Sequence, residues 1–172
     1  MRGIFILLLL CFTAIRVFAY DGQADFSGWY VSPSIGGVVT HRNFPAKTAP
    51  LVGLQLGYDV DEYWSAELGL WMSPARSRAD DPMTLTQGTL DGLYHFLHWE
   101  ALDPYLFVGT GIFHSDVAVF DSCKTSLGLR LGGGAFYYFS DRFALRAGLG
   151  VTLCSYKARV AAMGNAGVTW SF

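Results

Sequence analysis

The fold is decided by residues 126–150, SLGLRLGGGAFYYFSDRFALRAGLG, in which two alternating segments flank the dipeptide Ser140-Asp141. Before this dipeptide, leucines take every second position from Leu127, while glycine and Arg130 take the positions between them. After it, residues 143, 145, 147 and 149 are apolar, and Arg146 lies among the alternate positions. Alternation with a period of two predicts β-strands, so this stretch predicts a hairpin with a tight turn.

The same alternation recurs along the chain and predicts about eight strands, several of them as long as the 9–11 residues with which a tilted strand crosses a bilayer. Tight turns are expected at 60–61, 101–103 and 140–141, and longer loops at 41–50, 74–87, 115–124 and 155–159. The predicted fold is all-β, an eight-stranded antiparallel up-and-down barrel with both chain ends and the tight turns on one side. The predicted strands lie at 29–39, 51–60, 62–72, 89–99, 104–113, 126–139, 142–153 and 160–172.

The placement of charge indicates which face of the strands meets lipid. Charged residues make up only 15% of the chain, and none falls on the apolar strand faces. The opposite faces are rich in glycine, whereas a lipocalin-like barrel would put bulky apolar groups inside. A charge at the bilayer midplane costs about 2–4 kcal/mol, so the apolar faces are predicted to face lipid. The charges predicted to line the lumen are Asp59, Glu67, Asp91, Arg130 and Arg146.

These charges lead to a hypothesis about the lumen, because a buried charge needs a partner. Glu67 is expected to pair with Arg130 or Arg146 and to plug the interior, and Asp59, Asp91 and Gln55 are expected to extend the network. The role is expected to be structural, and no open pore is expected.

Aromatic residues gather at the tight-turn ends of the predicted strands and predict a girdle at one membrane interface. A sparser outer belt is expected at Trp71, Phe113 and Tyr156. The girdle is predicted to contain Trp29, Tyr30, Tyr58, Tyr63, Trp64, Trp99, Tyr105, Tyr137, Tyr138, Phe139, Phe143, Trp170 and Phe172.

Residues 1–19 have the features of a cleaved signal peptide, with Arg2, an apolar run and Val17-Phe18-Ala19 before the cut. Residues 20–27 are then a short periplasmic segment, and residues 28–172 form the barrel. Export to an oxidising compartment allows Cys123 and Cys154 to form a disulfide.

Three stretches resemble the small outer-membrane barrels of the outer-membrane protein A and X superfamily: PYLFVGTGIFH (104–114), the hairpin quoted above, and the terminal VTWSF. The resemblance implies a location in the bacterial outer membrane, where we expect a monomer in contact with lipid. The basic residues of the predicted long loops would suit contact with anionic lipopolysaccharide. It also implies that Val168, Trp170 and Phe172 form the signal read by the barrel-assembly machinery. Pro33 departs from the pattern and predicts a bulge in the first strand.

Other functions find weaker support in the sequence. A formal net charge of −2 does not suggest a nucleic-acid partner. His95 and His98 point to opposite faces of a strand, so no metal site is expected, and no cofactor is expected either. A lipid A-modifying enzyme would resemble the deacylases, but no His-any-Ser pair occurs and His114 and Ser115 are adjacent. A surface adhesin or ligand-binding barrel acting through residues 74–87 remains an alternative.

Overall fold

The computed structural model describes residues 28–40, 47–76, 81–97, 99, 101–117, 122–155 and 159–172. The predicted signal peptide, 1–19, and the segment 20–27 lie outside these residues, as does His98. Eight strands account for most of the described chain. They are β1 (Gly28–Thr40), β2 (Ala49–Asp59), β3 (Trp64–Arg76), β4 (Pro82–His95), β5 (Leu102–Val117), β6 (Ser122–Tyr138), β7 (Phe143–Cys154) and β8 (Arg159–Ser171).

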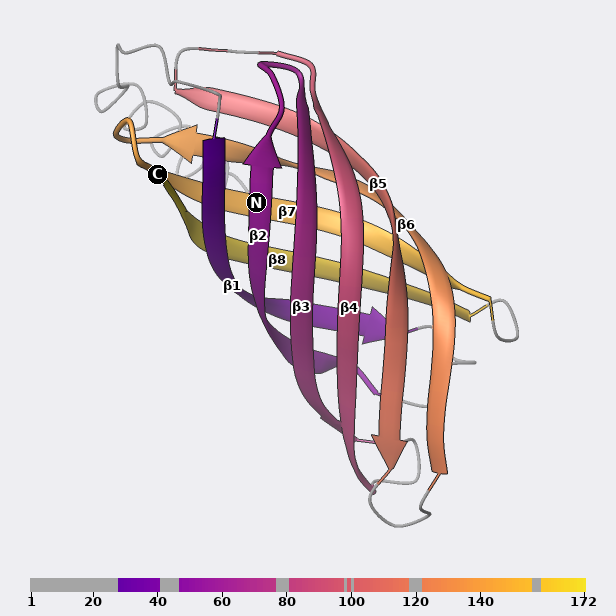
Figure 1. Cartoon of the computed structure of the whole chain (residues 1–172). Coiled ribbons are helices and arrows are strands. Elements are labelled where there is room, and N and C mark those ends of the chain that lie inside the picture. Colours follow the sequence, from indigo (N-terminus) through magenta and orange to yellow (C-terminus); the bar gives the residue numbers. More distant parts are fainter. Residues whose placement is uncertain are drawn as a thin grey trace, which may run out of the picture.

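The strands form one closed antiparallel barrel in which each strand pairs with its neighbours in sequence, and β8 closes on β1 (Figure 1). This confirms the predicted fold. We call the end that holds Gly28, Phe172 and connections 60–63, 96–101 and 139–142 the terminal end. We call the end with connections 41–48, 77–81, 118–121 and 155–158 the loop end. No helix in the described residues is long and apolar enough to cross a membrane.

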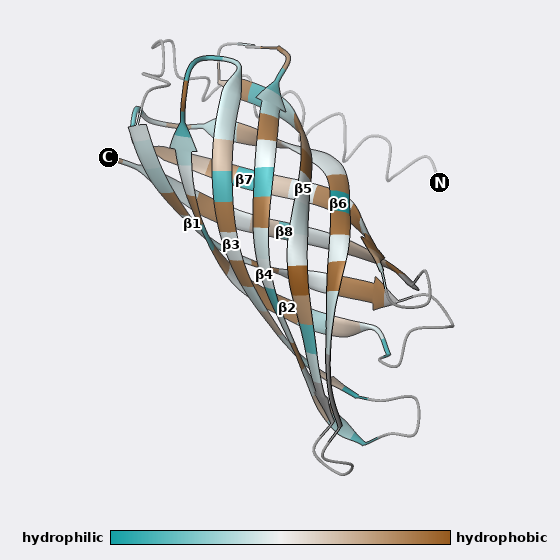
Figure 2. Ribbon diagram, turned by 45° about the vertical axis from the view of Figure 1, so that its right-hand side comes forward, coloured by the Kyte–Doolittle hydropathy of each residue, from teal (hydrophilic) through white to brown (hydrophobic). Residues whose placement is uncertain are grey.

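The outer wall of the barrel is apolar. In β3, exposed and buried positions alternate without a break from Trp64 to Arg76, and hydrophobic and hydrophilic bands alternate along the ribbons in Figure 2. Leu54, Leu68 and Leu149 all point outward, so they do not share an interior. Outward leucines and inward charges are the arrangement that a hydrocarbon solvent requires.

The predicted loops are shorter than expected, because the strands continue past them. Residues 82–87 belong to β4 and pair with 71–76 of β3, so most of the predicted loop 74–87 is sheet. Likewise, 115–117 pair with 122–124. Three loop-end connections, 77–81, 118–121 and 155–158, are about as long as those of the terminal end, whereas the connection 41–48 is longer. The prediction of a loop is thus wrong for residues 74–76 and 82–87, whereas ligand binding through this region stays a prediction.

Pro33 causes no bulge, contrary to the prediction. The β1–β2 register is continuous from Gly28 opposite Asp59 to Val38 opposite Ala49, with Pro33 opposite Leu54. The β1–β8 pairing also keeps one register on both sides of residues 32–33, where pairing is interrupted. Because proline has no N–H, the ladder loses a bond there without changing register.

The predicted disulfide between Cys123 and Cys154 is not formed. Cys154 is a buried thiol and lies opposite Gly128 in the β6–β7 register. Cys123 lies five positions before Gly128 in β6, nearer the loop end, and pairs with Asp116 of β5. Five residues of strand span about 16 Å at roughly 3.3 Å per residue, whereas a disulfide needs Cα atoms within about 7 Å.

The predicted aromatic girdle divides into two groups. An outer group stacks around the terminal end, with ring centroids 5.0 Å apart for Trp29 and Tyr58 and 4.9 Å apart for Trp64 and Tyr94. Tyr30 and Tyr105 were predicted in the girdle but are buried inside the barrel. Trp71, predicted in the outer belt, is also buried inside. Each of these three residues has the strand parity of the inner face, which overrides its position along the strand.

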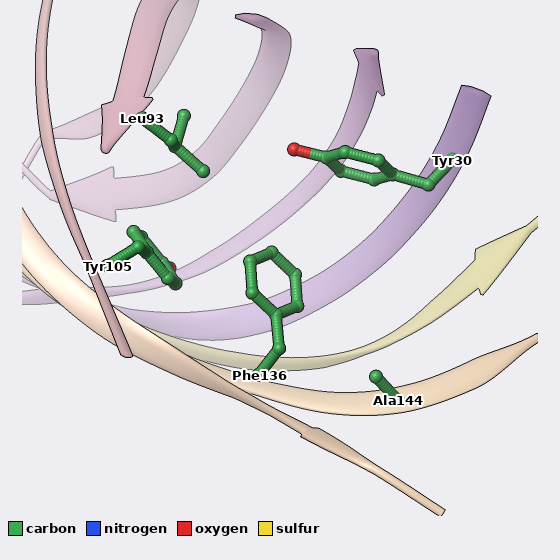
Figure 3. Close-up of a cluster of buried hydrophobic side chains, with 5 residues drawn as sticks. All are labelled: Tyr30, Leu93, Tyr105, Phe136 and Ala144. Atoms are coloured by element: carbon green, nitrogen blue, oxygen red, sulfur yellow. The ribbon is translucent and has the colours of Figure 1, made fainter. Parts of the chain in front are cut away.

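The lumen therefore holds large aromatic side chains as well as small and ionic ones. Tyr30, Leu93, Tyr105 and Phe136, with Ala144, point toward one another from five strands (Figure 3). Glycine provides the space: a Cβ at Gly57 would lie 2.0 Å from the ring of Tyr30. Toward the loop end the lumen holds two apolar clusters, which are Leu51, Trp71 and Met163 in one and Val38, Ala49, Ala75, Met83 and Leu85 in the other.

A charge on the outer wall should destabilise the barrel in a bilayer. We expect Leu70→Arg to lower the free energy of unfolding by about 2–4 kcal/mol, because Leu70 points into hydrocarbon midway along β3. The measurement is guanidinium unfolding in phospholipid vesicles. Thr48→Arg, at an exposed position just before β2, is the control and should change stability by less than about 0.5 kcal/mol. Equal stability of both variants would show that Leu70 does not face lipid.

Candidate functional site

The centre of the lumen is occupied by an ion pair between β3 and β7. Two nitrogens of the Arg146 guanidinium donate to the two carboxylate oxygens of Glu67, at 2.5 Å to Oε2 and 3.2 Å to Oε1. Both side chains are almost fully buried. Such a two-point contact fixes the orientation as well as the separation of the two groups. Of the two partners considered for Glu67, the structure places Arg146 against it.

Aromatic side chains complete the surroundings of this pair. The hydroxyl of Tyr30 donates to Glu67 Oε2 at 3.1 Å, and Arg146 Nε donates to the hydroxyl of Tyr105 at 2.9 Å. The guanidinium also lies 5.0 Å from the ring centroid of Phe136 and 5.2 Å from that of Tyr105. These contacts satisfy the charges inside a space that solvent barely reaches, which is the condition for a buried ion pair to be tolerated.

A second ion pair lies beside the first, between β4 and β6. Arg130 donates through Nη1 to Asp91 Oδ2, and its Nη2 contacts the sulfur of Met163 at 3.4 Å. The guanidinium lies 5.4 Å from the ring centroid of Phe107. Each arginine in the described lumen therefore has its own carboxylate, and the two pairs together are neutral.

Asp59 is not part of these pairs. It lies one inward position closer to the terminal end than Glu67, since Gly57 is opposite Glu67 and Asp59 is opposite Ser65. Asp59 accepts a hydrogen bond from the hydroxyl of Ser65. Ser65 in turn contacts His95, for which the sequence predicted no role. Because His95 follows the inward-pointing Leu93 by two positions, strand alternation alone would have predicted that it lies in the lumen.

Little empty space remains between the ion pairs. A cavity of about 20 Å³ is lined by Gln55, Trp71, Asp91 and Arg130 among others, and it is large enough for about one water molecule. Asp91 Oδ1 and Trp71 Nε1 are buried there without a hydrogen-bond partner in the structure, and such groups favour an ordered water. The described residues contain no group of three or more His, Cys, Asp or Glu placed to hold a metal ion.

The predicted assembly signal is positioned on the outer wall. Val168, Trp170 and Phe172 all point outward and are exposed. Trp170 stacks on Phe143, with ring centroids 6.3 Å apart, and contacts the tilted ring of Phe172 at 5.6 Å. The amide of Phe172 also donates to the carbonyl of Trp29, which ties the last residue to β1. Recognition of these side chains by an assembly machinery remains a prediction.

The fold and the lumen define a small transmembrane β-barrel of the outer-membrane type. Residues 5–172 match the family model described as "Outer membrane protein beta-barrel domain". The chain belongs to this family, which implies a location in the bacterial outer membrane. A search of curated proteins found no match.

Solved structures of small outer-membrane barrels resemble the chain over almost their whole length. Neisserial surface protein A is 18% identical with a TM-score of 0.74, covering 85% of this chain and 98% of its own. OprG from Pseudomonas aeruginosa is 14% identical with a TM-score of 0.64, covering 88% and 99%. Ail, the attachment invasion locus protein of Yersinia pestis, is 12% identical with a TM-score of 0.59, covering 85% and 97%. At these identities the likeness concerns the fold.

Removing one partner of the Glu67–Arg146 pair should lower the free energy of unfolding more than replacing both partners by apolar residues. We expect Arg146→Met alone to lower the free energy of unfolding by about 3–5 kcal/mol, because Glu67 is left buried and uncompensated. The double variant Glu67→Met/Arg146→Met should cost less than either single variant. Arg142→Met, exposed in the 139–142 turn, is the control. The measurement is guanidinium unfolding, in vesicles, of Glu67→Met, Arg146→Met, the double variant and the control. If the losses of the two single variants add up in the double variant, the pairing is contradicted.

Space at Gly57 should be essential for the position of Tyr30. In Gly57→Ala the new Cβ would collide with the Tyr30 ring, so Tyr30 must move and withdraw its hydroxyl from Glu67. We expect a loss of about 1–3 kcal/mol of stability. Gly37→Ala is a matched control, since its Cβ would meet nothing closer than 3.7 Å. Tyr30→Ala should reduce the penalty of Gly57→Ala; an undiminished penalty would locate the strain elsewhere.

Proposed function

We propose that the protein is a non-conducting outer-membrane barrel with a structural role, in membrane integrity and surface display. Its outer wall anchors it in lipid, and its filled lumen gives the wall internal support. In the orientation usual for such barrels, the terminal end faces the periplasm and the loop end faces outward. Contact with lipopolysaccharide at the outer leaflet is part of this proposal.

The observation that carries the proposal is the filling of the lumen by side chains from opposite walls. The Glu67–Arg146 pair joins β3 to β7, and the Arg130–Asp91 pair joins β6 to β4. Aromatic rings occupy the space on the terminal side of these pairs, and apolar clusters occupy the space on the loop side. A ligand pathway would require a connected opening, whereas the cavity between the ion pairs has room for about one water.

The proposal can be tested by electrical recording and by genetics. The purified barrel, reconstituted in planar bilayers, should leave the conductance at its baseline, with an open porin as the positive control. Removal of the protein from its cell should increase sensitivity to detergents and to bulky antibiotics, and the wild-type protein should restore resistance. Discrete, long-lived open levels would overturn the non-conducting role. Unchanged sensitivity after removal would overturn the role in membrane integrity.

A further inference from the structure

Between the ion pairs and the terminal end lies a second polar cluster, which contains no arginine or lysine among the described residues. Four adjacent strands each contribute one side chain: Asp59 from β2, Ser65 from β3, His95 from β4 and Asp103 from β5. Ser65, His95 and Asp103 are buried, whereas Asp59 is partly exposed beside the 60–63 connection. The cluster therefore reaches from the interior to the solvent at the terminal end.

The four side chains form an unbroken chain of short contacts. Ser65 Oγ lies 2.6 Å from Asp59 Oδ1 and 2.8 Å from His95 Nε2. On the other side of the imidazole, Nδ1 lies 2.7 Å from Asp103 Oδ2. All three separations are in the range of good hydrogen bonds, so each contact needs one hydrogen between its two atoms.

Counting hydrogens shows that the chain needs one more than its neutral members supply. A serine hydroxyl carries one hydrogen, and a neutral imidazole carries one on its ring nitrogens. Two ionised carboxylates carry none, so three contacts would share two hydrogens. One further proton completes the chain, either on the imidazole or on a carboxylate, and its position among them does not alter the count.

The charges around the cluster also favour binding of this additional proton. The cluster contains two carboxylates, while Glu67 and Asp91 are already neutralised by Arg146 and Arg130. Among the described residues, the other titratable side chains facing the cluster are Tyr105 and Tyr138, together with Tyr30, which is bonded to Glu67. The ring of Phe136 stacks on the imidazole at 6.0 Å. Without the proton, the two carboxylates of the cluster would both be charged at a site where burial of Asp103 limits its contact with water, which is costly.

We infer that Asp59, Ser65, His95 and Asp103 form a proton-binding site that takes one proton from the solvent at the terminal end. When the proton is bound, hydrogen bonds run continuously from β2 to β5 and brace that end of the barrel. When it leaves, two acceptor atoms face each other at one of the contacts. The site therefore stabilises the barrel at lower pH, and this contribution is lost as the pH rises.

The order Ser-His-Asp is also that of a hydrolytic triad, but the surroundings argue against a nucleophile. In a triad the serine hydroxyl gives its proton to the histidine. Here the hydroxyl of Ser65 is directed at Asp59, and the side chain is only 4% exposed. A substrate outside the barrel could not reach it, whereas a proton can arrive through Asp59.

The test compares the cost of removing Ser65 at two pH values. Ser65→Ala deletes both contacts of the hydroxyl without changing any charge. In vesicle unfolding, we expect it to reduce the folded-to-unfolded ratio about tenfold more at pH 6 than at pH 9, since one charge-assisted bond has already been lost at pH 9. Ser32→Ala is the matched control, because Ser32 is buried and pairs with the hydroxyl of Thr169 at 2.9 Å. Ser32→Ala should reduce the folded-to-unfolded ratio by the same factor at both pH values.

A measurement on the wild-type protein covers the case in which Ser65→Ala does not fold. The side-chain ¹⁵N resonances of His95, assigned by comparison with His95→Gln, should change between pH 6 and pH 9 as the chain gains or loses its proton. Equal costs of Ser65→Ala at both pH values would overturn the inference. Ring resonances of His95 and carboxyl ¹³C resonances of Asp59 and Asp103 that all stay unchanged over this range would also overturn it.

Discussion

The structure depends on one constraint: in hydrocarbon, every backbone N–H and C=O must be bonded within the protein. A sheet meets this requirement only when it closes, and the β1–β8 pairing closes it here. The interruption at Pro33 is tolerable for the same reason, since a residue without an N–H leaves one donor fewer to satisfy. Next to the interruption, the hydroxyls of Ser32 and Thr169 bond across the β1–β8 seam inside the barrel.

Closure fixes which residues share the lumen, and this part could be predicted from the sequence. Side chains alternate between the two faces, so parity alone places Glu67, Asp91, Arg130 and Arg146 inside. The same parity places Tyr30, Tyr105 and Trp71 inside, but aromatic residues near strand ends are more readily assigned to a girdle. The structure shows that parity, and not proximity to an interface, decides whether these side chains point inward.

Partner choice across the lumen could not be predicted in the same way. Glu67 and Arg146 are 79 residues apart and lie on strands that do not pair. Whether they meet depends on the stagger of the closed sheet, which local sequence does not encode. The positions at which the strands end could not be predicted for a different reason. Near the loop end both faces of β4 carry polar residues, such as Thr84, Thr86 and Gln87, so alternation disappears although pairing continues.

The lumen changes character along its length, and this change bears on whether it can open. Its loop half holds apolar clusters around Trp71, Met83 and Leu85 together with buried polar side chains such as Ser73, and its middle holds two ion pairs. A rearrangement that exchanged the partners of Glu67 would remove only the ionic barrier. Water and ions would still meet an apolar stretch that offers few partners for hydrogen bonds, where dewetting obstructs passage. Under the proposed non-conducting role, the apolar clusters and the ion pairs would act as two barriers in series, because no single side-chain movement removes both.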